Sequence, residues 1–232
     1  MTNKNNYTTV SHNIQVKNTF KKSRFYTSVK ELKKEEEIRE FLKDLKEQFP
    51  DASHYCWAYK IGINEQQIKQ YSDAGEPANS AGPPILQAIE QEELTNVMVI
   101  VTRYFGDIKL GIGGLIRAYR ESALQGLQSA GRVEKFALRE FILQGINYRE
   151  LGPIIQAIES REGRIADVSY GEEITVITHL PESRQGWLND MAKNISHHGR
   201  VTIKIGQIKW YRGTSGSGLT GSQKVKENYF IK

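Results

Sequence analysis

The first half of the chain carries a helical pattern followed by a strand pattern. Apolar residues between Ile38 and Phe49 recur at the spacing of one helical face, and Pro50 follows them, which predicts a helix over 37–49. The next run, 56–63, is short, aromatic and β-branched, which is typical of a strand. The pattern therefore indicates a mixed domain rather than an all-helical one.

The strongest strand signal lies at 96–102, where a continuous apolar centre is typical of a strand buried on both faces. Two adjacent prolines, Pro83 and Pro84, suit the first turn of a preceding helix. A glycine cluster follows the strand, and an apolar stripe then predicts a helix over 115–130. These elements predict an N-terminal α/β domain over 21–133.

The segment 134–212 predicts a second domain, with strands and helices in the order β-α-β-β-α-β. This order is typical of a ferredoxin-like fold. The predicted fold class is therefore α+β with two domains. The expected elements are a strand at 136–148, a helix at 151–161, strands at 164–170 and 174–180, a helix at 184–196 and a strand at 201–210.

Both ends of the chain carry weaker patterns. Residues 1–20 are rich in Asn, Thr and Lys with little apolar periodicity, which predicts a flexible or loosely docked N-terminus. The stretch 213–221 is rich in Gly, Ser and Thr, which predicts a flexible tail over 213–232.

The composition of the 232-residue chain is that of an ordinary globular protein, with 38% hydrophobic and 25% charged residues. No apolar run approaches the ~20 residues that a membrane-spanning helix needs. The N-terminus also lacks the apolar stretch of a signal peptide. The single cysteine, Cys56, excludes an intrachain disulfide and a multi-cysteine metal site. We therefore expect a cytoplasmic protein with no membrane partner.

The charge balance is mildly basic, with 32 Lys and Arg against 27 Asp and Glu and a formal net charge of +5. The excess is spread over both predicted domains and the tail. Proteins dedicated to duplex DNA usually concentrate more positive charge than this. The balance permits RNA as a partner, whereas DNA is not expected.

The segment 103–119 combines the end of a buried strand, a glycine cluster and the start of a helix. Backbone N–H groups at such a helix start can bind an anion, and basic residues beside aromatic ones are typical of RNA-binding surfaces. The alternative is that the glycines allow tight turns and close packing while the arginines are solvated. The segment lacks the Gly-Lys-Ser/Thr of a P-loop and the spacing of a dinucleotide fingerprint. The candidate RNA- or phosphate-binding residues are Arg103, Tyr104, Lys109, Arg117 and Tyr119.

The loop 72–84, rich in Gly and Pro, contains a second candidate site. Asp73 and Glu76 are close enough in sequence to converge on one ligand, and paired carboxylates can perform acid–base chemistry. In a loop of this composition, such side chains more often hydrogen-bond to backbone N–H groups and fix the turn. His54 is the third candidate for this loop or cleft, as a polar contact.

No catalytic constellation emerges from the sequence. Cys56 lies two residues from His54, but no third group is evident to orient the histidine, so Cys56 is interpreted as a small buried hydrophobe. His197 and His198 are adjacent and have no acidic or thiol partner at metal-ligand spacing. We therefore expect no metal and no cofactor, and the sequence favours a non-enzymatic protein.

Five blocks of residues lie in one order between residues 22 and 119. They are Lys22-Ser23-Arg24-Phe25, His54-Tyr55-Cys56-Trp57-Ala58-Tyr59, Ser72-Asp73-Ala74-Gly75-Glu76-Pro77, Ala81-Gly82-Pro83-Pro84-Ile85-Leu86, and Arg103-Tyr104-Phe105-Gly106 with Gly113-Gly114-Leu115-Ile116-Arg117-Ala118-Tyr119. In these blocks the chain resembles the IMPACT/YigZ family, and its second domain resembles the smaller C-terminal domain of the bacterial members.

The resemblance implies an N-terminal α/β sandwich like that of a ribosomal protein domain and a domain of elongation factor G. It also implies a ferredoxin-like C-terminal domain. Two departures from the family pattern stand out, since Ala74 replaces a second acidic residue and Asp107 stands where glycine is usual. Asp107 places a negative charge in the predicted anion-binding loop, which would weaken phosphate binding there.

The resemblance also implies a role in translation. Eukaryotic relatives are linked to translational control, through competition for an activator of a stress kinase, and bacterial relatives are suspected of binding ribosomes or nucleic acid. The leading hypothesis is a non-enzymatic, translation-associated regulator that binds the ribosome or structured RNA, with a protein of the translation apparatus as a second partner. The alternatives are a hydrolase that uses Asp73, Glu76 and His54, and a protein-binding adaptor that contacts no RNA.

Overall fold

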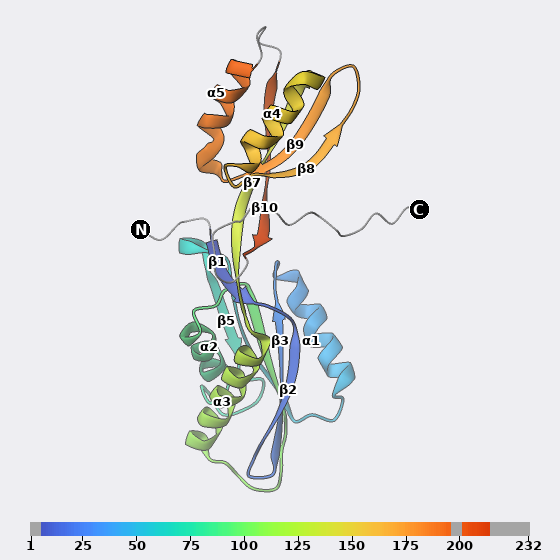
Figure 1. Cartoon of the computed structure of the whole chain (residues 1–232). Coiled ribbons are helices and arrows are strands. Elements are labelled where there is room, and N and C mark those ends of the chain that lie inside the picture. The colour runs from blue at the N-terminus through green and yellow to red at the C-terminus, as the bar shows by residue number, and fades with distance from the viewer. Residues whose placement is uncertain (1–5, 196–200, 214–232) are drawn as a thin grey trace. The chain divides into compact units, whose positions relative to one another are not determined.

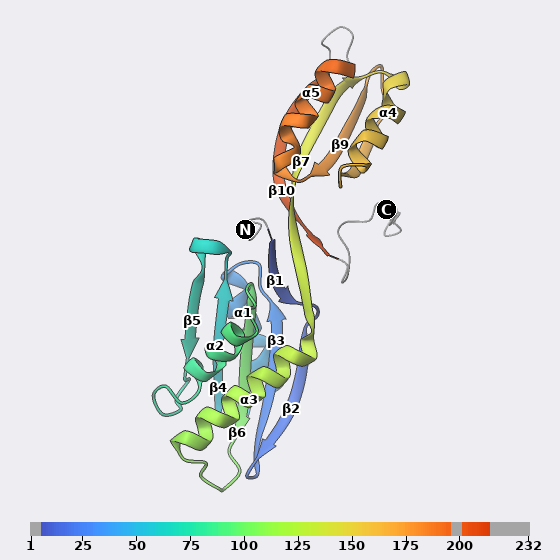
Figure 2. The same ribbon diagram turned by 60° about the vertical axis from the view of Figure 1, so that its left-hand side comes forward.

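The computed structural model describes residues 6–195 and 201–213, and the chain divides into two compact units, Met1–Glu134 and Lys135–Lys232 (Figures 1 and 2). The sequence places the domain boundary between residues 133 and 134, one residue from this division. Within the described residues, no helix is both long enough and apolar enough to cross a bilayer.

Unit 1 contains a five-stranded antiparallel sheet and three helices. Its elements are β2 (Ile14–Phe20), β3 (Ser23–Glu31), α1 (Glu36–Gln48), β4 (His54–Ile61), β5 (Ile68–Ser72), α2 (Gly82–Gln91), β6 (Val97–Tyr104) and α3 (Ile112–Ala130). The strand order is β2-β3-β6-β4-β5, so the apolar strand β6 lies at the centre of the sheet. Helices α2 and α3 lie on one side of the sheet and α1 lies on the other (Figures 1 and 2).

Strand β6 contributes to the cores on both faces of the sheet. Val99 and Val101 belong to the cluster that packs under α2 and α3, whereas Met98 and Ile100 belong to the cluster under α1. The alternation follows from the two-residue period of a strand, which points successive side chains to opposite faces. All four side chains are fully buried, which confirms the prediction of a strand covered on both sides.

The predicted flexible N-terminus, 1–20, is wrong for residues 6–20, which form β1 (Asn6–Val10) and β2. Ile14 and Phe20 of β2 pack against the core. Between them Asn18 interrupts the apolar alternation, but its amide donates to Ser122 Oγ of α3 at 3.4 Å. The polar residue is thus accommodated by a partner distant in sequence, which local periodicity does not reveal.

Unit 2 has the predicted β-α-β-β-α-β order. Its elements are β7 (Arg132–Ile146), α4 (Tyr148–Glu159), β8 (Arg164–Ser169), β9 (Ile174–Leu180), α5 (Gln185–Ile195) and β10 (Thr202–Arg212). The strands pair antiparallel in the order β10-β7-β9-β8, and α4 and α5 bury a common apolar core. The ferredoxin-like prediction is therefore confirmed, and the fold is α+β with two domains.

Strand β7 ends two residues earlier than the sequence predicts. The strand expected at 136–148 ends at Ile146, because Asn147 N–H donates to the Glu150 carboxylate at 3.0 Å and α4 starts there. His197, His198 and residues 214–232, which include most of the predicted tail, lie outside the described residues.

Candidate functional site

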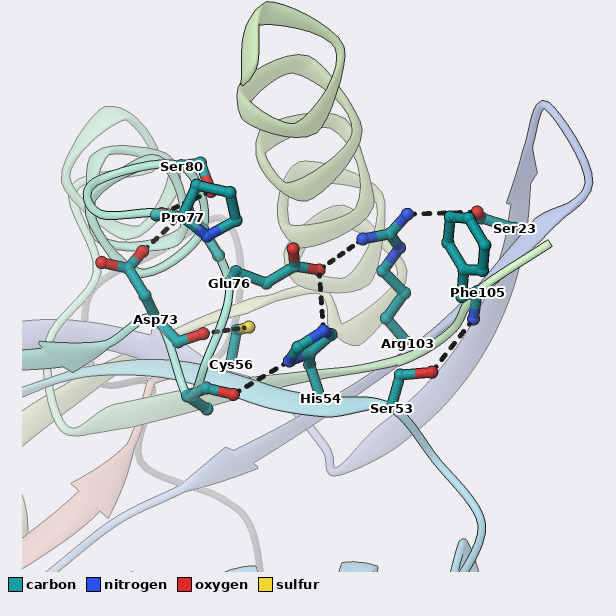
Figure 3. Close-up of polar contacts among 12 residues, drawn as sticks. Ser23, Ser53, His54, Cys56, Asp73, Glu76, Pro77, Ser80, Arg103 and Phe105 are labelled. Carbon is teal, nitrogen blue, oxygen red and sulfur yellow. Dashed lines mark hydrogen bonds and ion pairs between the residues drawn. The ribbon is translucent and has the colours of Figure 1, made fainter. Parts of the chain in front are cut away.

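A buried ion pair lies where the end of β6 meets the loop after β5 and helix α3 (Figure 3). Glu76 Oε1 accepts a hydrogen bond from Arg103 Nη1 at 2.6 Å and another from Tyr119 OH at 2.7 Å. The side chains of Glu76 and Arg103 are only 3% and 6% exposed. Two donors of this kind on a buried oxygen favour the ionised carboxylate, because the desolvation cost is offset by the pairing.

The Arg103 guanidinium is held by several groups at once. Its Nη2 donates to Ser23 Oγ at 3.3 Å, and its Cζ lies 5.6 Å from the ring centre of Phe25 and 5.5 Å from that of Phe105. Its Nε is buried and has no hydrogen-bond partner among the described residues. The guanidinium is therefore held through two of its three nitrogens, and the third, Nε, has no partner among the described residues.

His54 completes the cluster from the first residue of β4. Its Nδ1–H donates to the Ala74 carbonyl at 3.0 Å, and its Nε2 lies 3.9 Å from Glu76 Oε1 (Figure 3). Both ring nitrogens of His54 therefore face oxygen acceptors, at hydrogen-bond distance only for Nδ1. His54 and Glu76 are thus brought together as the sequence predicts.

Asp73 serves the loop rather than the cleft. Its Oδ1 accepts hydrogen bonds from the backbone N–H groups of Ala81 and Gly82, and its Oδ2 accepts one from Asn79 N–H, all within 2.9 Å. These bonds close the loop and satisfy N–H groups at the start of α2, where a carboxylate is favoured. The structure therefore supports the interpretation that Asp73 fixes the turn, because both of its carboxylate oxygens accept hydrogen bonds from backbone N–H groups.

Cys56 and Tyr119 are buried next to the ion pair. Burial raises the pKa of the Cys56 thiol to about 12, and Cys56 Sγ donates to the Asp73 carbonyl at 3.0 Å. Burial also raises the pKa of Tyr119, which therefore remains a phenol that donates to Glu76. A protonated, buried thiol is a poor nucleophile, so the structure supports the interpretation of Cys56 as a buried hydrophobe.

The five predicted RNA-contacting residues do not share one surface. Arg103 and Tyr119 are buried in the ion-paired cluster, where both donate to Glu76, so neither side chain lies on an exposed surface. Tyr104 follows Arg103 on the strand and therefore lies on the other face of the sheet, where its ring contacts Tyr26. Only Lys109 and Arg117 are exposed. The burial has a clear cause, because the Glu76 carboxylate compensates the desolvated guanidinium.

A cavity of about 240 Å³ opens beside the ion pair at the start of α3. Two of its lining side chains are exposed apolar groups, Phe105 at 48% and Ile112 at 62% exposed. The sequence offers Phe105 as a stacking face, and strand alternation places it on the same face as Arg103, whereas Ile112 was not among the candidates. The lining residues are Glu76, Pro77, Arg103, Phe105, Lys109, Leu110, Gly111, Ile112 and Leu115.

The first turn of α3 leaves its backbone N–H groups available. Its N-cap is Gly111, at φ +73°, which provides no side-chain cap, and its first turn carries no acidic residue. A helix N-terminus carries partial positive charge and binds anions through free N–H groups. Lys109, on the cavity lining, adds a full positive charge to the same mouth.

Comparison with known proteins places this site within a described family. Residues 21–127 match the Impact N-terminal domain. The chain is 34% identical over 189 residues to "IMPACT family member YvyE" of Bacillus subtilis (strain 168), which covers 82% of this chain and 86% of the relative. The chain belongs to the IMPACT family. The IMPACT domain match spans the ion pair and the whole cavity lining.

Two further comparisons support the assignment to the IMPACT family. "IMPACT family member YigZ" of Escherichia coli (strain K12) is 31% identical over 172 residues, which cover 74% of this chain and 84% of the relative. A solved structure titled "Crystal structure of an hypothetical protein" aligns with a TM-score of 0.60 and 27% identity, over 86% of this chain and 96% of that chain. In the part of the chain that the structure describes, no three His, Cys, Asp or Glu side chains cluster as metal ligands.

Proposed function

We propose that this chain is a non-enzymatic, translation-associated regulator in the cytoplasm that binds the ribosome or structured RNA through the cavity mouth of unit 1. The observation that carries the proposal is the exposed combination at the start of α3. There, Lys109 and the uncapped helix N-terminus lie beside the exposed ring of Phe105. Cations bind phosphates and aromatic rings stack on unpaired bases, so this combination fits RNA.

Further cations from a distant segment lie at the same end of unit 1. A Cβ atom added to Gly106 would lie 2.1 Å from the carbonyl atoms of Lys22, so the turn between β2 and β3 packs directly on the loop after β6. Lys21 and Lys22 in that turn are exposed, as is Arg117 on α3. Asp107 is the exposed acidic residue of this loop and opposes the cations only in part.

The hydrolase alternative is less well supported by the geometry. Asp73 has both carboxylate oxygens bonded to backbone N–H groups, and Glu76 is held by Arg103 and Tyr119. Neither is poised as a free general base. Membership of the IMPACT family, whose eukaryotic relatives the sequence resemblance links to translational control, supports the translation-associated role, with a protein of the translation apparatus as a further proposed partner.

Co-sedimentation of the purified chain with ribosomes of its host, at a series of salt concentrations, tests the proposal. We expect retention that weakens steeply with salt, and Arg117→Ala should reduce the salt slope by about one unit if it removes one phosphate contact. Arg39→Ala, which removes an exposed cation from α1, is the matched control and should leave the slope unchanged.

Two outcomes would contradict the proposal. One is absence of retention at every salt concentration. The other is an equal loss for Arg117→Ala and Arg39→Ala, which would show only diffuse charge attraction. Retention that survives nuclease treatment of the ribosomes would favour the adaptor alternative without RNA contact.

A further inference from the structure

We propose that the cavity at the start of α3 holds one unpaired nucleobase, which donates an N–H to Glu76 Oε2, so that the RNA partner is single-stranded at this point. The inference rests on the proposed function, because it requires that unit 1 binds RNA. It goes further by assigning a base-binding role to the cavity and a position to the adjoining phosphate.

The floor of the cavity has an acceptor that the protein does not use. Arg103 Nη1, Tyr119 OH and His54 Nε2 all approach the same oxygen, Glu76 Oε1. In Figure 3 the other oxygen of Glu76 points away from Arg103 and His54, and no donor among the described residues bonds to it. Glu76 lines the cavity, and this oxygen is not a buried atom left without a partner, so it stays accessible and a ligand N–H can bond to it there.

The walls of the cavity are apolar and suit a small planar group. Pro77, Phe105, Leu110, Ile112 and Leu115 line it. Its volume of about 240 Å³ is below the ~300–1,000 Å³ of pockets that hold drug-sized ligands. The backbone N–H of Phe105 donates to Ser53 Oγ at 3.2 Å, and the Arg103 Cζ lies 5.5 Å from the ring centre, so the half-exposed ring offers a stacking surface beside the ion pair.

The rim of the cavity is suited to a phosphate. Gly113, the second residue of α3, has a negative φ, and a Cβ added there would meet nothing within 4 Å, so neither backbone strain nor packing requires glycine at this position. Glycine is less favourable than alanine inside a helix. Glycine at this position is explained if an anion approaches the N–H groups of the first turn closely, because glycine has no side chain to block that approach.

The charges of the site select among possible occupants. An acidic peptide side chain would meet Glu76 at the floor, and a basic one would meet Lys109 and the positive end of α3 at the rim. A nucleotide avoids both conflicts, because its base is neutral, planar and carries N–H donors while its phosphate is anionic. The base then lies in the cavity and the phosphate lies at the start of α3.

The test measures binding of the full chain to fluorescently labelled RNA by anisotropy. The probes are a single-stranded oligoadenylate, the same backbone with abasic riboses, and a duplex of equal length. We expect the abasic and duplex probes to bind at least about five-fold more weakly than the single strand, as the loss of one stacked base predicts.

Two matched variants separate the site from general effects. Gly113→Glu places a negative charge at the second residue of α3, and Gly186→Glu does the same in α5, where Gly186 also has open space around it. Both changes suit a helix N-terminus, so neither should lower the melting temperature. Gly113→Glu should weaken binding of the single strand at least ten-fold, and Gly186→Glu should leave it unchanged.

The outcomes distinguish the inference from the function on which it rests. Equal binding of all three RNA probes, with salt dependence retained, would overturn the base-binding cavity and leave the RNA-binding function standing. Absence of binding to every RNA probe would contradict RNA binding itself. Displacement of the single strand by polyglutamate at equal charge concentration would overturn the base-binding role in favour of an acidic peptide.

Discussion

Glu76 and Arg103, 27 residues apart in the chain, form a buried ion pair in which Oε1 and Nη1 lie 2.6 Å apart. Lys69 and Glu90 form a second pair with the same 2.6 Å separation, but their side chains are 42% and 41% exposed. The two pairs are equal in distance and differ in burial. Their contributions to stability should therefore differ, because a buried charge left without its partner is costly whereas water solvates an exposed one.

We expect Arg103→Ala to lower the free energy of unfolding by about 3–5 kcal/mol, because it leaves Glu76 buried and unpaired. Lys69→Ala should change it by only about 0–1 kcal/mol. Urea denaturation of both variants, compared with the unmodified chain, checks the difference. Similar losses for the two variants would contradict the buried-pair assignment.

Asp73→Ala should destabilise the loop between β5 and α2, since three backbone N–H groups lose their acceptor. We expect a loss of about 1–3 kcal/mol in the free energy of unfolding. Asp73→Asn, which retains an acceptor oxygen, should lose less, and Asp44→Ala on the exposed face of α1 is the control. Hydrogen exchange should accelerate at Ala81 and Gly82 in Asp73→Ala, and unchanged exchange there would refute the capping role.

Gly126→Ala tests how closely α3 packs on β3. The added Cβ would lie 2.6 Å from Thr27 Cγ2 and 3.0 Å from Val29 Cγ2, so the helix or the strand must shift. Overpacking of this kind costs about 1–3 kcal/mol, which exceeds the gain of up to about 1 kcal/mol from replacing a helical glycine. We therefore expect net destabilisation, with Gly113→Ala, in open space, as the variant that should not destabilise. Thermal unfolding measures both.

Because its thiol is buried, Cys56 should make the free energy of unfolding fall at alkaline pH. Burial raises its pKa from 9.0 to about 12, so the folded chain retains a thiol proton that the unfolded chain releases. The associated stability is complete below pH 9.0 and is lost as the pH rises towards about 12. Cys56→Ala should show a shallower decline in the free energy of unfolding over this window. Identical pH profiles for the two proteins would show that Cys56 does not contribute.

The helices and the central strand were predictable because their signals are local. The helical period from Ile38 to Phe49 reflects one buried face of α1, and the apolar run of β6 reflects burial on both faces. The ferredoxin-like order of unit 2 followed from the same local periods. Long, strongly patterned elements need no knowledge of their neighbours to be recognised.

Strand β2 was not predictable in the same way. Asn18 breaks its apolar alternation, and its partner Ser122 lies 104 residues away on α3. A polar residue facing inward is acceptable only when a distant group bonds to it, and a local pattern does not contain that information. The prediction of a flexible N-terminus failed over β2 for this reason.

The sequence by itself determined the fold class, the two-domain division, the strand–glycine–helix segment and the presence of Glu76, His54 and Lys109 near a polar site. Only the tertiary structure decided which charges are paired and which are free. Arg103 and Arg117 are chemically identical in the sequence, yet one is buried against Glu76 and the other is exposed. The physical reason is that pairing and desolvation depend on distance in space, which chain folding sets and residue spacing does not.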